Sequence, residues 1–382
     1  MRSIGRAGWA SHGFFGFDAQ TFGNPDGATS GGGAWQGVTN QGGDGAAAGL
    51  TPKGIRDGGA NINGPDQGGG GGGGGGTVWT ARSSPTTSEM LSITFGNNTF
   101  IAITADVPSI AVFSSDAGAD WAESIAGLPD VQSTQIGFGA STFMVACNGG
   151  GPLTFSTDNG LVWNTTTGTP FTGMGAVSVA FSQPDGIWLA LGNSTGPDNY
   201  AVSSNGGGIW IQPADFTNSG WDFNALIWDG TQFVALGTPL AGGAAIYTSA
   251  DGSHWVETVL PDTTRRNSPV AFGAGNYMIG NGAATTVRVA PTPAGLATAA
   301  DLPVTFNPIT GDASITTVLY DPAGPFFIAF GDGGGVSTST DLGVTWTPGT
   351  LNFSAGAECF AAAYGNGMVV AVSTAGDIST LP

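Results

Sequence analysis

The sequence predicts an all-β fold: a seven-bladed β-propeller with split-blade closure, preceded by an irregular glycine-rich N-terminal arm. Three observations predict it. A hairpin motif recurs seven times, and a turn motif recurs between the hairpins. One further tryptophan lies one repeat length before the first full turn motif, where the tryptophan of another copy is expected. The chain contains 68 glycines among 382 residues, which is too much glycine for a helical protein. We expect two parts, an arm over residues 1–76 and a propeller over residues 77–382.

The first motif is a hairpin, two short runs of β-forming residues around a turn that contains Gly, Asn, Asp or Pro. Each copy has a central aromatic residue that is followed by a small or acidic residue. A repeat of roughly 40–50 residues is typical of propellers, in which each repeat is one four-stranded sheet. The central aromatic residues are Phe95, Phe138, Phe181, Trp228, Phe272, Tyr320 and Tyr364.

The second motif reads S/T-x-D-x-G-x-x-W and lies between the hairpins. Its glycine allows a positive φ, its short acidic side chain can accept from free N–H groups of the turn, and its tryptophan begins the next strand, where the ring packs between sheets. We therefore expect these residues to stabilise the fold. They are Ser114, Asp116, Gly118 and Trp121; Ser156, Asp158, Gly160 and Trp163; Asn205, Gly207 and Trp210; Asp251, Gly252 and Trp255; and Asp341, Gly343 and Trp346.

In these residues the chain resembles the Asp-box repeat family, also called BNR repeats, which includes sialidases, sortilin-type receptors and many phage and bacterial propellers. The resemblance implies a sialidase- or sortilin-like propeller whose boxes are turns far from any ligand. The sequence departs from the pattern at three places. Asn205 replaces one aspartate, Ala250 stands where another is expected unless Asp251 serves, and over residues 287–303 the box has decayed. These turn segments are called boxes below.

Trp79 predicts how the ring closes. It has the Gly-x-x-Trp phase of a box without its first half, and it precedes Trp121 by the same 42 residues that separate Trp121 from Trp163. The chain ends where a further strand with a tryptophan would begin. We therefore expect the strand near residues 77–84 to complete the last sheet, which residues 359–382 start, so that no terminal sheet stays unpaired. Six blades with a decayed insertion, or a β-solenoid, are the alternatives.

The propeller is strongly acidic. It holds 22 of the 27 acidic residues, whereas its only basic residues are Arg82, Arg265, Arg266 and Arg288. Affinity for nucleic acid comes from Lys and Arg that neutralise phosphates, so we expect no nucleic-acid partner, and anionic membranes are disfavoured for the same reason. The sequence has no apolar run that could insert into a membrane and no secretory signal.

The arm differs in composition and ends in nine consecutive glycines at residues 68–76. Composition alone favours a disordered tail or linker. Aromatic residues nevertheless cluster within the first 35 positions, which favours a docking arm that orders against another protein. The expected docking residues are Trp9, Phe14, Phe15, Phe17, Phe22 and Trp35.

Residues for catalysis or metal binding are scarce. The two histidines, His12 and His254, lie in different segments, so we expect no histidine-based metal site. The loops around Asp26, Asp198 and Asp332 lack the dense alternating carboxylates of a dedicated calcium loop. We expect no cofactor, and we expect Cys147 and Cys359 to be buried apolar residues without a disulfide.

A sialidase is the main enzymatic alternative, because that family also carries Asp boxes. The resemblance would require a tyrosine nucleophile helped by a glutamate, an acid–base aspartate and an arginine triad that clamps the substrate carboxylate. The propeller has four arginines, and the neighbours Arg265 and Arg266 would point to opposite faces of a strand. We therefore expect no catalytic residues and no enzymatic activity.

The composition favours a protein of a bacteriophage particle. Scarce lysine and abundant Gly, Thr, Ser and Asn are typical of an extracellular, protease-exposed surface, and lysis releases phage proteins without a secretory signal. We expect a virion surface protein, a fibre-borne adhesin or a capsid decoration, which binds other virion proteins through residues 1–76. Its propeller loops would face a host-surface glycan or receptor. A carbohydrate-binding lectin-like surface protein, an intracellular scaffold and, least favoured, a glycosidase of sialidase-like fold are the alternatives.

Overall fold

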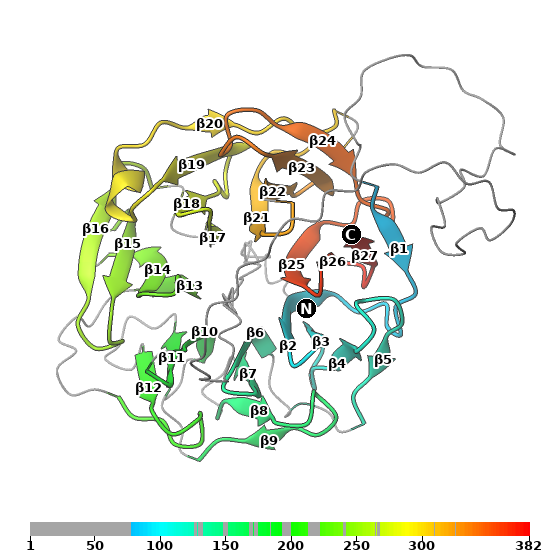
Figure 1. The fold of residues 1–382 in the computed structure, drawn as a ribbon, viewed down its shortest axis with the longest axis vertical. Coiled ribbons are helices and arrows are strands. Elements are labelled where there is room, and N and C mark those ends of the chain that lie inside the picture. Colours follow the sequence, from blue (N-terminus) through cyan, green and yellow to red (C-terminus); the bar gives the residue numbers. More distant parts are fainter. Residues whose placement is uncertain are drawn as a thin grey trace, which may run out of the picture. The chain divides into compact units, whose positions relative to one another are not determined.

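The computed structural model describes residues 78–382 except for short segments at 126–127, 129–132, 148–151, 168–170, 172–174, 184, 193–199, 213–221, 240–241, 264, 266–267, 309 and 325. The described residues form seven antiparallel sheets, which surround a common axis (Figure 1). The predicted seven-bladed propeller is confirmed. The arm over residues 1–76, with its expected docking residues, lies outside the described residues.

Each blade is a meander that runs outward from the axis. Blade 1 contains β2 (Met90–Gly96), β3 (Thr99–Thr104), β4 (Ala111–Ser114) and β5 (Ala122–Glu123). Blade 2 contains β6 (Ser133–Gly139), β7 (Thr142–Cys147), β8 (Thr154–Ser156) and β9 (Asn164–Thr165). Blade 3 contains β10 (Ala176–Ser182), β11 (Ile187–Gly192) and β12 (Tyr200–Ser203). Blades 4 and 5 contain β13 (Asp222–Trp228), β14 (Phe233–Thr238), β15 (Ala244–Ser249) and β16 (Val256–Leu260); and β17 (Val270–Gly273), β18 (Asn276–Ile279), β19 (Thr286–Ala290) and β20 (Leu302–Pro303). Blades 6 and 7 contain β21 (Ile315–Asp321), β22 (Phe326–Gly331), β23 (Gly335–Ser339) and β24 (Thr347–Thr350); and β25 (Cys359–Gly365), β26 (Met368–Ser373), β27 (Ile378–Leu381) and β1 (Thr80–Arg82).

The innermost strands explain why the central aromatic residue is followed by a small one. A Cβ atom on Gly96 of blade 1 would collide with the ring of Phe138 of blade 2. The same contact closes the ring, because a Cβ on Gly365 of blade 7 would collide with the ring of Phe95 of blade 1. Glycine therefore lets neighbouring blades approach until an aromatic ring packs on the backbone. Four blades have this glycine: Gly96, Gly139, Gly273 and Gly365.

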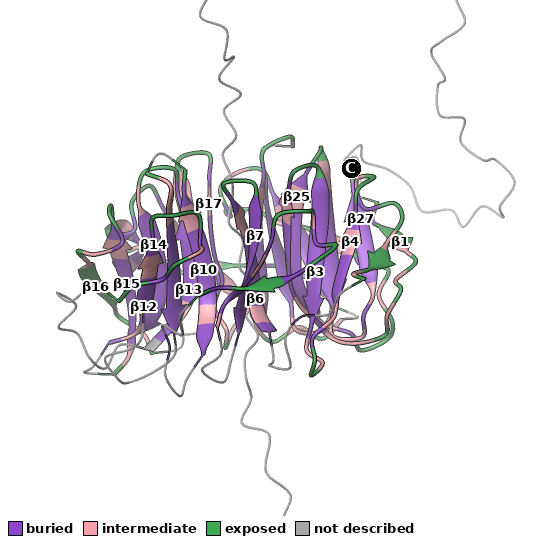
Figure 2. Cartoon of the chain, turned by 90° about the horizontal axis from the view of Figure 1, so that it is seen from below, coloured by how far each residue is buried: buried purple, intermediate pink, exposed green. Residues whose placement is uncertain are grey.

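The core lies between the blades. Both faces of each sheet are covered by neighbours, so the second strands β3 and β7 are buried at every position (Figure 2). This burial explains the continuous apolar runs in the sequence, where a half-exposed sheet would show alternation. Cys147 and Cys359 are both buried free thiols, as the sequence predicts.

Blade 7 is built from both ends of the propeller. Strand β1 pairs antiparallel with β27, with Thr80 opposite Thr380 and Arg82 opposite Ile378. Trp79 is only 2% exposed and packs edge-on against Phe330 of blade 6, with ring centroids 5.8 Å apart. The predicted split blade is confirmed, because a strand before the first full repeat completes the last sheet.

Two blades depart from four regular strands. In blade 3 the outer strand is reduced to a bridge between Val202 and Ile211. In blade 5, where the box has decayed, the 3-10 helix η2 (Ala294–Ala297) follows two prolines, Pro291 and Pro293, and leads to the two-residue strand β20. Proline lacks the N–H group that a sheet ladder needs, so this segment cannot continue the sheet. Among the described residues, no helix has the length and hydropathy to cross a membrane.

Candidate functional site

The full boxes share one hydrogen-bond circuit. In the first box, Ser114 Oγ donates to Asp116 Oδ1 at 2.7 Å and accepts the N–H of Gly118 at 2.9 Å. Asp116 Oδ1 also accepts the N–H of Asp120 at 3.0 Å, and Trp121 Nε1 donates to the Gly118 carbonyl at 3.1 Å. The serine–acceptor–glycine part recurs around Asp158, Asn205 and Asp341. The acidic side chain thus accepts from its own turn.

The degenerate box of blade 4 uses Asp251, not Ala250. Ser249 Oγ donates to Asp251 Oδ1 at 3.2 Å, and the N–H groups of Ser253 and His254 reach the same oxygen at 2.8 Å. The His254 side chain is exposed, and its Nδ1 lies 2.6 Å from Asp251 Oδ2. The turn is one residue shorter between its acid and its glycine, which explains the apparent mismatch in the sequence.

The boxes also join neighbouring blades. Gly118 (φ +82°) faces Val370 of blade 7, and Gly160 (φ +84°) faces Ile101 of blade 1, so a side chain at either position would be strained and crowded. Trp163 lies in a core cluster with Ile101, which belongs to the preceding blade. Each of these positions therefore contacts the blade before its own.

Hydrogen bonds hold the box carboxylates in their ionised form. The N–H of Asp120 and then the hydroxyl of Ser114 lower the pKa of Asp116. The hydroxyl of Thr345, followed by its N–H, lowers the pKa of Asp341 to about 2. A carboxylate that is already hydrogen-bonded and ionised at neutral pH is a weak general base, so this arrangement suits a turn more than acid–base chemistry.

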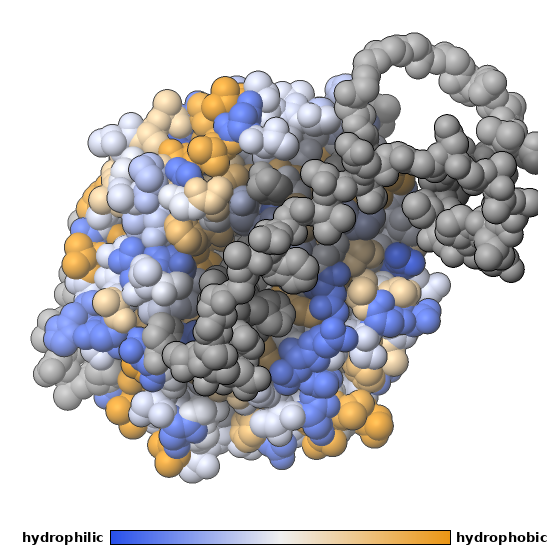
Figure 3. Space-filling view, in the orientation of Figure 1, coloured by the Kyte–Doolittle hydropathy of each residue, from blue (hydrophilic) through white to orange (hydrophobic). Residues whose placement is uncertain are grey.

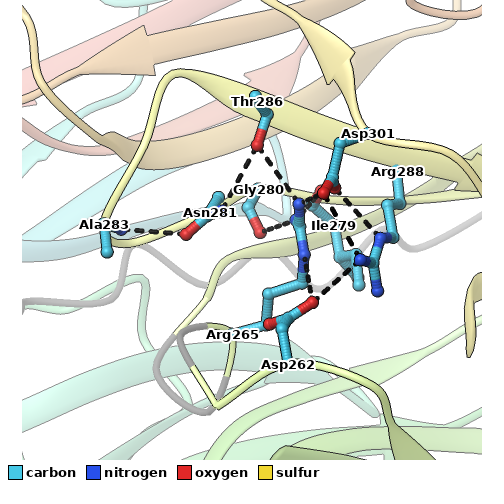
Figure 4. Close-up of polar contacts among 9 residues, drawn as sticks. All are labelled: Asp262, Arg265, Ile279, Gly280, Asn281, Ala283, Thr286, Arg288 and Asp301. Carbon is cyan, nitrogen blue, oxygen red and sulfur yellow. Dashed lines mark hydrogen bonds and ion pairs between the residues drawn. The ribbon is translucent and has the colours of Figure 1, made fainter.

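Blade 5 contains a buried ionic cluster in the part that lacks a box (Figure 4). Arg265 is fully buried; it pairs with Asp301 through Nη2, and its Nη1 donates to the Gly280 carbonyl at 2.6 Å. Arg288 on β19 contacts Asp301 Oδ1 at 3.0 Å and Asp262 Oδ2 at 2.9 Å. Asp262 Oδ2 also lies 3.3 Å from Arg265 Nε. Each aspartate thus contacts both arginines, and the four residues are called the blade 5 network below.

Sequence reasoning missed this network. It expected Arg265 and Arg266 to point to opposite faces of a strand, whereas Arg265 lies in the connection after β16 and Arg266 lies outside the described residues. Burial lowers the pKa of Arg265, and Asp301 opposes that effect. Three of the four propeller arginines, Arg265, Arg266 and Arg288, lie in or just before the repeat that lost its box. This clustering was the feature of the sequence that could have indicated the network.

The acidic loop at Asp332 also has its carboxylates engaged. Asp332 accepts the N–H groups of Ala313 and Ser314, at 2.6 and 3.1 Å. Asp312 accepts the N–H groups of Gly333 and Gly335, at 2.7 and 3.0 Å. In the part of the chain that the structure describes, no three His, Cys, Asp or Glu side chains are placed to hold a metal ion. The loops around Asp26 and Asp198 lie outside the described residues.

The propeller is similar to solved structures of YCF48. It is 17% identical to YCF48 from Cyanidioschyzon merolae, with a TM-score of 0.59, over 79% of this chain and 98% of that chain. It is 14% identical to a YCF48 described as bound to D1 peptide, with a TM-score of 0.61, over 79% of this chain and 94% of that chain. The computationally designed Ika8 protein is 12% identical over 78% of this chain and 98% of its own, with a TM-score of 0.50. Identities this low show the fold alone.

No protein-family model matches the chain, and no curated protein sequence matches it. The comparisons therefore support the seven-bladed propeller. They do not identify the repeats as Asp-box repeats, which rests on the sequence motif alone.

Proposed function

We propose that this chain is a non-enzymatic component of a bacteriophage particle, a fibre-borne adhesin or capsid decoration, which attaches through residues 1–76 and displays its propeller outward. The observation that carries the proposal is that the described arginines of the propeller make contacts within the propeller. Arg265 and Arg288 are closed inside the blade 5 network, and Arg82 donates to Thr380 Oγ1 at 2.9 Å across the split blade.

Of the described arginines in the propeller, Arg265 and Arg288 are buried and Arg82 is half-buried, so they do little to balance the acidic side chains at the described surface. The sequence has no lysine after Lys53, and the structure assigns the described arginines of the propeller to internal contacts. High net charge of one sign keeps protein domains soluble and separate, which suits a domain that faces solvent. The arm holds Arg2, Arg6, Lys53 and Arg56 together with its aromatic residues, which suits attachment to another protein.

We further propose that the repeats are of the Asp-box type and that the boxes are scaffold. The hydrogen-bond circuit supports this, since it uses the acidic oxygen within the turn. One similar propeller is described as bound to D1 peptide, which supports a binding role for this chain. Recognition is then a property of the loops and edges of the blades.

The test compares the full chain with residues 77–382 during particle assembly. The shortened chain should be soluble and folded by circular dichroism, and it should be missing from purified particles. A matched full-length variant with Phe14, Phe15 and Phe17 changed to Ala should also be missing if these rings anchor the arm. Incorporation of residues 77–382 at normal copy number would overturn the proposal. Glycan binding by residues 77–382, with neither chain found in particles, would favour the lectin-like alternative.

A further inference from the structure

The outer strand of blade 4 differs from the other outer strands that the structure describes. The outer strands β5, β9 and β20 have two residues each, β1 has three and β24 has four. Strand β16 has five residues, Val256–Leu260. Short edge strands protect a sheet from pairing with other chains, because an edge presents unpaired N–H and C=O groups. Blade 4 therefore has the longest outer strand among the described blades, one residue longer than β24.

Two of the three exposed side chains of β16 are apolar. Val256 is 65% exposed and Val259 is 58% exposed. Because side chains alternate along a strand, the two valines project from opposite faces of the blade. Figure 3 shows apolar atoms on the rim at the left edge, where Figure 1 places β16. Leu260 packs into the core with Leu296 of η2, so the open part of the strand is 256–259.

One charged residue lies in the middle of this edge. Glu257 is exposed and stands opposite Tyr247 of β15. Burial raises the pKa of the Tyr247 hydroxyl, and the nearby Glu257 side chain adds to that rise. The edge therefore offers two aliphatic side chains around a negative charge.

We propose that β16 accepts an additional β-strand from a partner protein, an extended segment with aliphatic residues beside Val256 and Val259 and a lysine or arginine beside Glu257. Backbone hydrogen bonds supply the affinity of such strand addition and side chains supply its specificity. Charge complementarity selects this occupant over a second copy. A second copy that paired through its own β16 would bring a second Glu257 to the edge, and of the described arginines only Arg82, on the three-residue strand β1, is partly exposed.

The probe is a synthetic peptide with blocked ends and the sequence Lys-Thr-Val-Thr-Lys-Val-Lys, which in antiparallel pairing sets its valines beside Val259 and Val256 and a lysine beside Glu257. Hydrogen exchange of the full chain, followed by mass spectrometry, reports which amides the peptide protects. We expect protection of the β16 segment and none at β24, the next longest outer strand. A peptide of the same length with proline at its centre is the control, since it keeps the charge and loses strand pairing.

Three variants locate the contact. Val256→Thr keeps the strand propensity and removes an apolar contact, and Val344→Thr is its control in blade 6, because both valines are 65% exposed. Glu257→Gln keeps a hydrogen-bond acceptor for Tyr247 and removes the charge. We expect Glu257→Gln to weaken peptide binding about fivefold, the scale of one cross-strand ion pair. Val256→Thr should weaken it and Val344→Thr should not.

Three outcomes would overturn the proposal. Equal binding of the proline peptide would show general attraction to an acidic surface. Protection at β24 with β16 unprotected would place the docking edge elsewhere. Dimers of the full chain in sedimentation that Val256→Thr abolishes would assign the edge to a second copy. All three readouts use the chain itself, and particle assembly has no part in them, so this inference stands or fails separately from the proposed function.

Discussion

At the scale of single residues, the boxes show why one aspartate can be replaced by asparagine. Asn205 Oδ1 accepts from Ser203 Oγ at 2.8 Å and from the N–H of Ile209 at 2.9 Å. Asp158 Oδ1 has the equivalent contacts with Ser156 and Val162, at 2.7 and 3.0 Å. One acceptor oxygen therefore completes the turn, and its negative charge is secondary.

This predicts different effects for two substitutions of Asp158. Asp158→Ala removes the acceptor and should lower the free energy of unfolding by about 1 kcal/mol, the usual scale of one hydrogen bond. Asp158→Asn keeps one oxygen and should cost clearly less. Urea denaturation at pH 7 measures both, with Asn205→Asp as the reverse control. If Asp158→Asn were as destabilising as Asp158→Ala, the turn would require the charge.

Glu358 predicts a pH-dependent effect. Burial raises the pKa of Glu358 above its ordinary value of 4.5, and the carboxylates of Asp332 and Glu89 raise it further. A raised folded pKa means that the neutral form is favoured by folding, so stability is lost as pH rises through the raised value. Glu358→Gln should therefore raise the melting temperature at pH 7 and leave it unchanged near pH 3.5. Glu123→Gln, at an exposed position of β5, is the control. A gain from Glu358→Gln that persisted at pH 3.5 would contradict the charge explanation.

At the scale of elements, much of the fold could be predicted because it repeats. The spacing of the central aromatic residues defined seven hairpins, and the phase of Trp79 defined the strand that closes blade 7. The blade 5 network could not be predicted. Its four residues come from three separate segments and occur in one repeat only, so no periodicity links them. The length of each outer strand was equally hidden, because the repeat pattern contains no signal for it.

The network should matter more for stability than a surface ion pair. Asp301→Asn would leave the fully buried Arg265 guanidinium with only Asp262 as a carboxylate partner. Loss of a partner from a buried ion pair costs several kcal/mol, and since Asp301 is partly exposed we expect about 2–3 kcal/mol. Asp120→Asn, in the exposed part of the first box, is the control for a change of net charge alone. Equal stability of the two variants would mean that solvent takes over the role of Asp301.

The network should also behave as one unit. Asp262 and Asp301 both contact Arg265 and Arg288, so the effects of Asp262→Asn and Asp301→Asn should not add. A double-mutant cycle in urea measures this coupling. Additive effects would separate the network into two independent pairs.

At the scale of the whole propeller, stability depends on closure of the ring. Blade 7 contacts blade 1 at the axis through Gly365 and Phe95, and it contacts blade 6 at the rim through Trp79 and Phe330. Its sheet order is β1-β27-β26-β25, so β27 is the strand that joins the N-terminal part of the propeller to the C-terminal part. A ring has no terminal blade with an open face, in contrast to a solenoid.

Removal of residues 374–382 therefore tests closure. This truncation deletes β27, which leaves β1 without a partner and exposes the open edge of β26 and the ring of Trp79. We expect the truncated chain to unfold or aggregate, because an unpaired apolar edge favours association between chains. Removal of Pro382 alone, which follows β27 and is exposed, is the control and should leave the melting temperature unchanged.

A peptide of residues 374–382 supplied during refolding should restore the soluble fold of the truncated chain, because it provides the missing strand between β1 and β26. The peptide with Ile378 changed to Pro should not, since this change removes a ladder N–H and a buried side chain. Recovery is measured as the soluble fraction and by the far-ultraviolet circular dichroism signal. If the truncated chain melted at the temperature of the full chain without peptide, β27 would be dispensable, and the ring would be held by contacts between the inner strands alone.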